Sequence, residues 1–218
     1  MATSLPVSDS DCTDRMAVSM VVCRCEHTAY PGESIPYTQI LKAGYLRGTG
    51  MESTTYSTTP IPQADYDLSA GRLCLDFANT ANWHAAETPK ELIPDYPYLL
   101  AWSRLAGLCN ERQAEHLLQQ AAYQPAEAIA IHARAIALRE AVYRLFSALS
   151  HEHEPGADDL AIINRELAHA FDHLSVVEEG RGFGWGWRES DALDHFLWPI
   201  ARSAAEVLTS EDLERVRE

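Results

Sequence analysis

The sequence predicts an α+β fold that is mostly helical, with its helices packed around a small antiparallel sheet. The helical evidence is clearest in residues 125–150, where apolar side chains recur in steps of three and four. The evidence for strands lies in residues 73–77 and 183–187, where apolar side chains alternate with other residues. A chain of 218 residues, 46% of them hydrophobic, is long enough to bury a core around such a sheet.

The first predicted strand, Leu73–Phe77, is the element around which we expect the rest to be arranged. Gly71 gives it a flexible entry, and residues 79–82 are of types that favour turns and helix caps. Asp76 interrupts this apolar run, and a buried carboxylate is costly unless it has hydrogen-bond partners. We therefore expect Asp76 to accept hydrogen bonds from the backbone of Asn79 and Thr80 and from an arginine, or to face a cleft.

Three helices are predicted in the middle of the chain. Asp95 can cap the first, with Pro97 in its first turn, and Gly107 ends it. Residues 110–113, Asn-Glu-Arg-Gln, form a capping box for the second. Pro125 opens the third and longest, which extends to about Ser150. Its apolar stripe consists of Ile131, Ala135, Leu138, Val142, Leu145 and Leu149.

The next segment predicts a polar loop at residues 151–156, then a helix with two acids, Asp158 and Asp159, in its first turn. Residues 174–177 and 183–187 then predict a hairpin around a glycine-rich turn. We expect the aromatic face of this hairpin to pack on the first strand and to form a sheet of about three strands.

A last large helix is predicted from its cap at Ser190 to Leu208, with a kink at Pro199 because proline lacks a backbone N–H. Thr209 or Ser210 caps a final short helix. The sequence stops without a helix terminator, so we expect that this element is cut short.

Composition limits the function classes. The five cysteines are an odd number without any Cys-x-x-Cys pair, which disfavours a disulfide framework and a zinc finger. No apolar run approaches the length of a membrane span and no secretory signal is present, so we expect a cytoplasmic protein without membrane contact. The formal charge is −15, which disfavours direct binding to nucleic acid.

The predicted domain organisation has two parts. Residues 1–66 have no sustained hydrophobic period and are expected to be a poorly ordered N-terminal extension, with Met51 as an alternative start of translation. Residues 67–218 form the predicted domain. In the extension, Cys23 and Cys25 with His27 supply too few ligands for a convincing metal site.

No pattern indicates catalysis. His169 and His173 lie four residues apart, but no third ligand is evident, and two exposed histidines are the expected interpretation. Cys74 and Cys109 are interpreted as small buried hydrophobic residues. Phosphate-binding, dinucleotide-binding and nucleophile-elbow motifs are lacking. The sequence therefore predicts no catalytic residue, metal or cofactor.

One constellation is the candidate ligand site. Arg202 follows the expected kink beside an apolar stripe, and a buried guanidinium requires a carboxylate, for which Asp76 is the natural partner. The pair ties the first strand to the last helix, or it lines a cleft in which Arg202 and Asn79 meet a polar or anionic ligand between tryptophans. The full candidate set is Asp76, Asn79, Thr80, Trp83, Trp185, Trp187 and Arg202.

Several segments together resemble a known family. They are residues 73–80 (LCLDFANT) followed by Trp83, 98–102 (YLLAW), 138–146 (LREAVYRLF), 185–187 (WGW) and 199–208 (PIARSAAEVL). From about Leu68 to Glu218 the chain is similar to the bacterial ABATE-domain family, described as stress-induced transcription regulators. Members of this family usually continue into a small CGNR-type zinc finger. The chain stops about where the first cysteine of that finger is expected, so the resemblance implies that the finger is missing.

Three functions remain open at this stage. The resemblance implies a non-enzymatic regulatory domain that binds a small molecule or a protein partner. The alternatives are an enzyme that acts on a small anionic metabolite through Asp76 and Arg202, and a purely structural or dimerising module, for which a homodimer is the expected partner.

Overall fold

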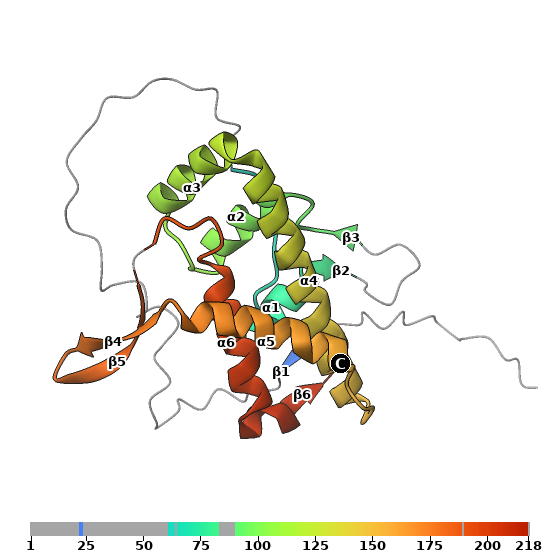
Figure 1. Ribbon diagram of the computed structural model, residues 1–218. Helices are drawn as coiled ribbons and strands as arrows, with labels where there is room; N and C mark the ends of the chain where they lie inside the picture. The colour runs from blue at the N-terminus through green and yellow to red at the C-terminus, as the bar shows by residue number, and fades with distance from the viewer. Residues whose placement is uncertain (1–21, 24–60, 64, 83–89, 189, 218) are drawn as a thin grey trace, which may run out of the picture.

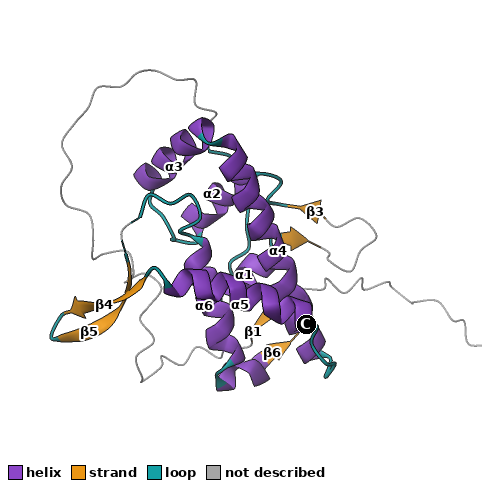
Figure 2. Cartoon of the chain, in the orientation of Figure 1, coloured by secondary structure: helices purple, strands orange, loops and turns teal. Residues whose placement is uncertain are grey.

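The computed structural model describes residues 22–23, 61–63, 65–82, 90–188 and 190–217. Helices dominate this part of the chain, and its strands form three separate antiparallel pairs, which confirms the mostly helical α+β class (Figures 1 and 2). The helices are α1 Leu73–Ala78, α2 Tyr96–Leu105, α3 Glu111–Tyr123, α4 Pro125–Ser150, α5 Ala157–Phe171, α6 Leu197–Leu208 and the 3-10 helix η1 Glu211–Arg215. The strand pairs are β1 Val22–Cys23 with β6 Val216–Arg217, β2 Ala81–Asn82 with β3 Lys90–Glu91, and β4 Leu174–Glu179 with β5 Gly182–Trp187.

The long helix α4 is the centre of the packing. The other five α-helices all contact it, as does β6 near the C-terminus (Figure 1). Its predicted bounds are confirmed, and so is its apolar stripe: Ile131, Leu138 and Leu145 are buried, while Leu149 at the end is half-buried. Burial of this stripe against several neighbours supplies most of the helix's stability, since helical propensity alone is weak.

The predicted ends of α2 and α3 are also confirmed. The Asp95 carboxylate accepts a hydrogen bond from the backbone N–H of Tyr98 at 3.1 Å, and Gly107 takes the left-handed conformation (φ 75°) after the helix. Asn110 and Gln113 form the capping box through two reciprocal hydrogen bonds of 2.9 Å. These local signals succeed because each satisfies backbone groups that a helix end leaves without partners.

The first predicted strand is wrong, because Leu73–Ala78 is the helix α1. Five of its six residues are buried; only Asp76 is half-exposed. A short segment that is buried on nearly all sides carries apolar residues at almost every position, whether it is a strand or a helix. A period of two therefore has no power to separate the two structures here.

The hairpin of β4 and β5 is confirmed, but the expected three-stranded sheet is wrong. Among the described strands, these two pair only with each other, and they project from the side of the body (Figure 2). Phe183 is 77% exposed and Trp185 51% exposed, so their rings do not pack on α1. Gly186 lies opposite Ser175, and a Cβ there would come within 2.8 Å of the Val177 side chain, which explains the need for glycine on that face.

The last large helix begins later than predicted, at Leu197 instead of after Ser190. The Ser190 hydroxyl accepts a hydrogen bond from Ala192 N–H at 3.1 Å, so it caps a turn. Pro199 is then the third residue of α6, where the backbone N–H needs no partner inside the helix, and the reason for the predicted kink disappears. Ser210 caps the following element, η1, as predicted.

The predicted extension, residues 1–66, lies mostly outside the described residues. Within it, β1 pairs with β6, and the Tyr66 hydroxyl lies 3.1 Å from the backbone oxygen of Tyr98, to which it donates. Among the described residues, no helix combines the length and the apolar character that crossing a membrane requires.

Arg139 is a polar residue that α4 buries although it lies off the apolar stripe. Only 3% of it is exposed. Its guanidinium donates to both carboxylate oxygens of Glu91 in β3, at 2.6 and 2.7 Å, and to Glu140 at 2.8 Å. Glu91 also accepts from the Ile93 N–H at 2.7 Å. One carboxylate thus neutralises a buried cation and holds the chain that enters α2.

Replacing Glu91 should therefore weaken the fold. We expect Glu91→Ala to lower the free energy of unfolding by about 2 kcal/mol, because it leaves a buried guanidinium with a single partner. Glu91→Gln keeps an acceptor for Ile93 N–H and should cost about half as much. Urea denaturation measures both, with the exposed Glu115→Ala as a control that should stay within about 0.5 kcal/mol of wild type. A Glu91→Ala midpoint equal to that of wild type would contradict this role.

Candidate functional site

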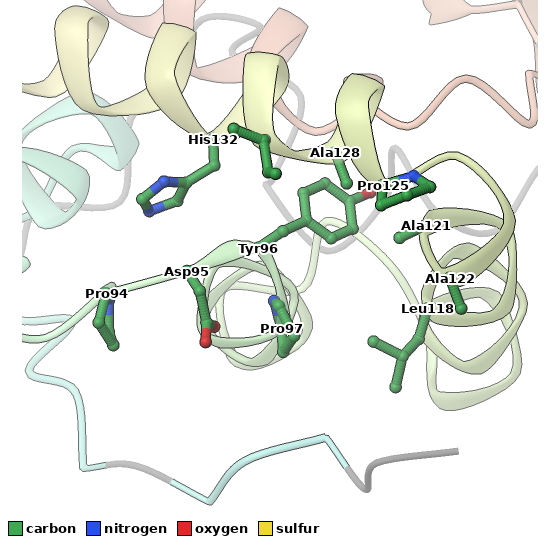
Figure 3. A pocket seen from close by; sticks show the side chains of 11 residues that line it. Pro94, Asp95, Tyr96, Pro97, Leu118, Ala121, Ala122, Pro125, Ala128 and His132 are labelled. Atoms are coloured by element: carbon green, nitrogen blue, oxygen red, sulfur yellow. The ribbon is translucent and has the colours of Figure 1, made fainter. Parts of the chain in front are cut away.

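A cavity of about 510 Å³ opens between the start of α2, the end of α3 and the start of α4 (Figure 3). Its volume lies within the range of about 300–1,000 Å³ that small-molecule sites occupy. The lining is mostly apolar. It consists of Pro94, Asp95, Tyr96, Pro97, Leu118, Ala121, Ala122, Pro125, Ala128, Ile129 and His132.

The sequence creates this space with a sharp elbow and small side chains. A single residue, Gln124, separates α3 from α4, and Pro125 fits the first helical position because its fixed φ suits a helix and its missing N–H is not needed. Alanines 121, 122 and 128 lie on either side of the elbow and fill little of the gap. The Tyr96 ring extends from α2 toward the start of α4 (Figure 3).

Three lining side chains carry polar groups. The Tyr96 hydroxyl donates to the backbone oxygen of Leu193 at 2.8 Å, and burial raises the Tyr96 pKa well above its usual value. The Nε2 atom of His132 lies 2.9 Å from the backbone oxygen of Ile93. Asp95 caps α2 and is otherwise exposed. Because burial raises the Tyr96 pKa, the hydroxyl of Tyr96 stays protonated and cannot serve as a base at neutral pH.

None of the described members of the predicted site lines this cavity. Thr80 is buried, and its hydroxyl donates to the Phe77 backbone oxygen at 2.7 Å, beside Asn79 at the end of α1. Trp185 and Trp187 belong to the projecting hairpin (Figure 1). Trp83 lies outside the described residues.

The predicted partners Asp76 and Arg202 are bonded to other groups. Asp76 accepts from the backbone N–H of Ala70 at 2.9 Å, and the Arg202 Nε donates to Glu206 on the same helix at 2.7 Å. The elements that carry them, α1 and α6, do pack together. A different contact joins them, in which the Ser203 hydroxyl accepts from Cys74 N–H at 3.2 Å.

Sequence reasoning missed a second polar cluster, around Trp198 of α6. The His173 ring stacks on the Trp198 ring, with 3.8 Å between centroids. Nearby, Asp194 accepts from the Arg134 guanidinium at 2.8 Å and lies 2.9 Å from Nε2 of His169. The spacing of His169 and His173 was the only sequence signal for this cluster. In the part of the chain that the structure describes, no group of three or more His, Cys, Asp or Glu side chains could hold a metal ion.

Cys74 and Cys109, the two cysteines of the helical body, do not supply a reactive thiol. Cys74 and Cys109 are both buried, and burial raises the pKa of each thiol to about 12. The thiolate is the reactive form, so both side chains are chemically quiet at neutral pH. This agrees with the prediction that they act as small hydrophobic residues.

Comparison with protein families matches residues 71–211 to the ABATE family model, described as "Putative stress-induced transcription regulator". The matched region is most of the chain and includes every α-helix in the described residues. The chain belongs to the ABATE family. No curated protein and no solved structure matched it. The ABATE region contains both the cavity and the cluster around Trp198, so both are features of the matched domain and not of flanking sequence.

The half-exposed Asp76 makes the stability of this ABATE domain depend on pH. Burial, opposed by the hydrogen bond from Ala70 and aided by the charge of Asp67, raises its pKa from 3.8 to about 6. A raised carboxyl pKa means that the folded state holds the proton more tightly than the unfolded state. The contribution of this group to stability is therefore greatest at low pH and declines as the pH rises from about 4 to about 6.

Asp76→Asn should remove this decline while its side-chain oxygen still accepts from Ala70. We expect the variant to gain stability relative to wild type as the pH rises from about 4 to 6, and the gain to level off above that range. Denaturant melts at several pH values measure the difference. The exposed Gln63→Ala, which changes no titratable group, serves as the control, and its difference in stability from wild type should not change with pH. If the stability difference between Asp76→Asn and wild type does not change with pH either, the raised pKa of Asp76 is contradicted.

Proposed function

We propose that this chain is the ligand-binding regulatory domain of an ABATE-type transcription regulator, and that a small molecule binds in the cavity between α2, α3 and α4. The cavity is the observation that supports this proposal. Its volume of about 510 Å³ suits a small molecule, and its walls are mainly apolar with a few polar groups, as ligand sites usually are. We propose a cytoplasmic protein that does not contact membranes.

The contacts around the cavity support a binding site over an enzyme. A hydrolytic or transfer site needs a nucleophile within hydrogen-bond reach of a base. The hydroxyl of Tyr96 instead donates to a backbone oxygen, and the thiols of Cys74 and Cys109 lie in the core. The metabolite enzyme based on Asp76 and Arg202 loses its support as well, because each residue is bonded elsewhere.

A route exists from the cavity to the end of the domain. The first eight residues of α4 line the cavity through Pro125, Ala128 and His132, and the same helix contacts β6. Figure 1 shows β6 beside the opposite end of α4. A ligand that shifts α4 would thus move the C-terminal strand, which is where family members usually continue into a zinc finger.

Blocking the cavity should abolish ligand binding without unfolding the domain. Ala122 lines the cavity and is exposed, so Ala122→Trp fills space without disturbing the core. A thermal-shift screen of small metabolites should find compounds that raise the Tm of wild type and of Ala130→Trp, an exposed control on α4 outside the lining, but not that of Ala122→Trp. Equal shifts in both variants would place the ligand elsewhere.

Residues 1–218 alone should not bind duplex DNA. The formal charge of −15 repels phosphates, and phosphate contacts supply most non-specific affinity. We expect no gel shift at physiological salt with protein in the micromolar range. A shift at these concentrations that weakens as salt is raised would contradict this part of the proposal.

A further inference from the structure

The donor groups of the cavity's polar side chains are already used in hydrogen bonds to the backbone. His132 lies 2.9 Å from the Ile93 backbone oxygen through Nε2, and a carbonyl can only accept, so Nε2 is the donor in this contact. The Tyr96 hydroxyl donates its hydrogen to the backbone oxygen of Leu193. The Asp95 carboxylate has no hydrogen to give. Neither the Tyr96 hydroxyl nor the His132 Nε2–H is therefore free to donate to a ligand.

Prolines make the walls still poorer in donors. Pro94, Pro97 and Pro125 supply three of the eleven lining residues, and proline has no backbone N–H. The remaining wall is aliphatic. A ligand with acceptor groups only, such as a carboxylate or a phosphate, would therefore lose its hydrogen bonds to water with little in return.

The described lining contains a carboxylate but no cationic Lys or Arg side chain. Asp95 is its one acidic residue. Glu127 lies close enough to contribute to the raised Tyr96 pKa, after burial and two other groups. A cation entering this space is attracted and an anion is repelled.

Helix ends oppose this preference, but only weakly here. Both α2 and α4 begin at the cavity, and a helix N-terminus favours negative charge. At α2 the Asp95 carboxylate already occupies that position, with Tyr98 N–H bound at 3.1 Å. At α4 the first residue is proline, and Glu127 lies in the first turn. A carboxylate thus caps α2, and another acidic residue lies in the first turn of α4, where it opposes the binding of an anion.

We propose that the cavity binds a compact apolar amine, with its ammonium group at the end where Asp95 and His132 lie and its apolar body against the prolines and alanines. The His132 ring contacts the backbone of Ile93, two residues before Asp95, so both residues lie beside the chain that enters α2. This inference rests on the proposed function, because it names the chemical class of the ligand for the same cavity.

The test compares three molecules that share one apolar body: tryptamine, tryptophol and indole-3-acetate. Calorimetric titration at pH 7.5 and low salt should show that tryptamine binds at least about ten-fold more tightly than indole-3-acetate, a difference of about 1.4 kcal/mol. Raising the salt concentration should weaken the binding of tryptamine and leave the binding of tryptophol unchanged, because salt screens only the charged ligand.

Asp95→Asn separates charge from structure. Asparagine caps helices as well as aspartate does, so α2 should persist while the negative charge is lost. We expect tryptamine affinity to fall several-fold, tryptophol affinity to stay the same, and the exposed loop variant Glu154→Gln to behave as wild type. Far-ultraviolet circular dichroism checks that the helices are intact.

The failures can be told apart. If the three molecules bind equally, or the acid binds most tightly, the amine assignment is wrong, while loss of their binding in Ala122→Trp would still support the cavity as the ligand site. If none of them binds at millimolar concentration, the amine assignment also falls. The proposed function then stands or falls with the metabolite screen on Ala122→Trp.

Discussion

The fold depends on covering α4 on several sides at once. This helix of 26 residues is about 39 Å long, and the other five α-helices pack on it. Its apolar stripe requires those neighbours, and the buried Arg139 requires Glu91 to approach from β3. A buried guanidinium without a carboxylate would cost several kcal/mol, so the β2–β3 segment is fixed against α4 by electrostatics as well as by packing. The entry into α2, and with it one wall of the cavity, follows from that anchor.

Helix ends and the long helix were predictable from the sequence because their causes are local. Asp95, Asn110 with Gln113, and Pro125 each satisfy or exploit backbone groups within one turn. The alternation in residues 182–187 likewise gave the hairpin correctly. The strand assigned to α1 failed for the opposite reason. Its residues are buried on nearly all sides by α4 and α6, and only tertiary contacts decide between a strand and a helix there.

The candidate site was less predictable. The expected Asp76–Arg202 pair assumed that a carboxylate in an apolar segment needs a cation, but one backbone N–H from Ala70 and a raised pKa answer the same need. The cavity itself leaves almost no pattern in the sequence, because it arises from what is small or missing: alanine side chains, proline N–H groups and one linking residue. The cluster at Trp198 joins α4, α5 and α6 and the turn before α6, which spacing within one helix cannot reveal.

The one-residue elbow at Gln124 has a mechanical consequence. With a single linking residue, the angle between α3 and α4 can change only through a few backbone dihedrals, so α3 must swing as a rigid rod whenever the gap beside the elbow widens or narrows. A rod of 13 residues is about 20 Å long, and a rotation of about 5° at its base would carry its tip roughly 1.7 Å. A small displacement near Ala121 would thus become a larger displacement at Asn110 and at the turn between α2 and α3.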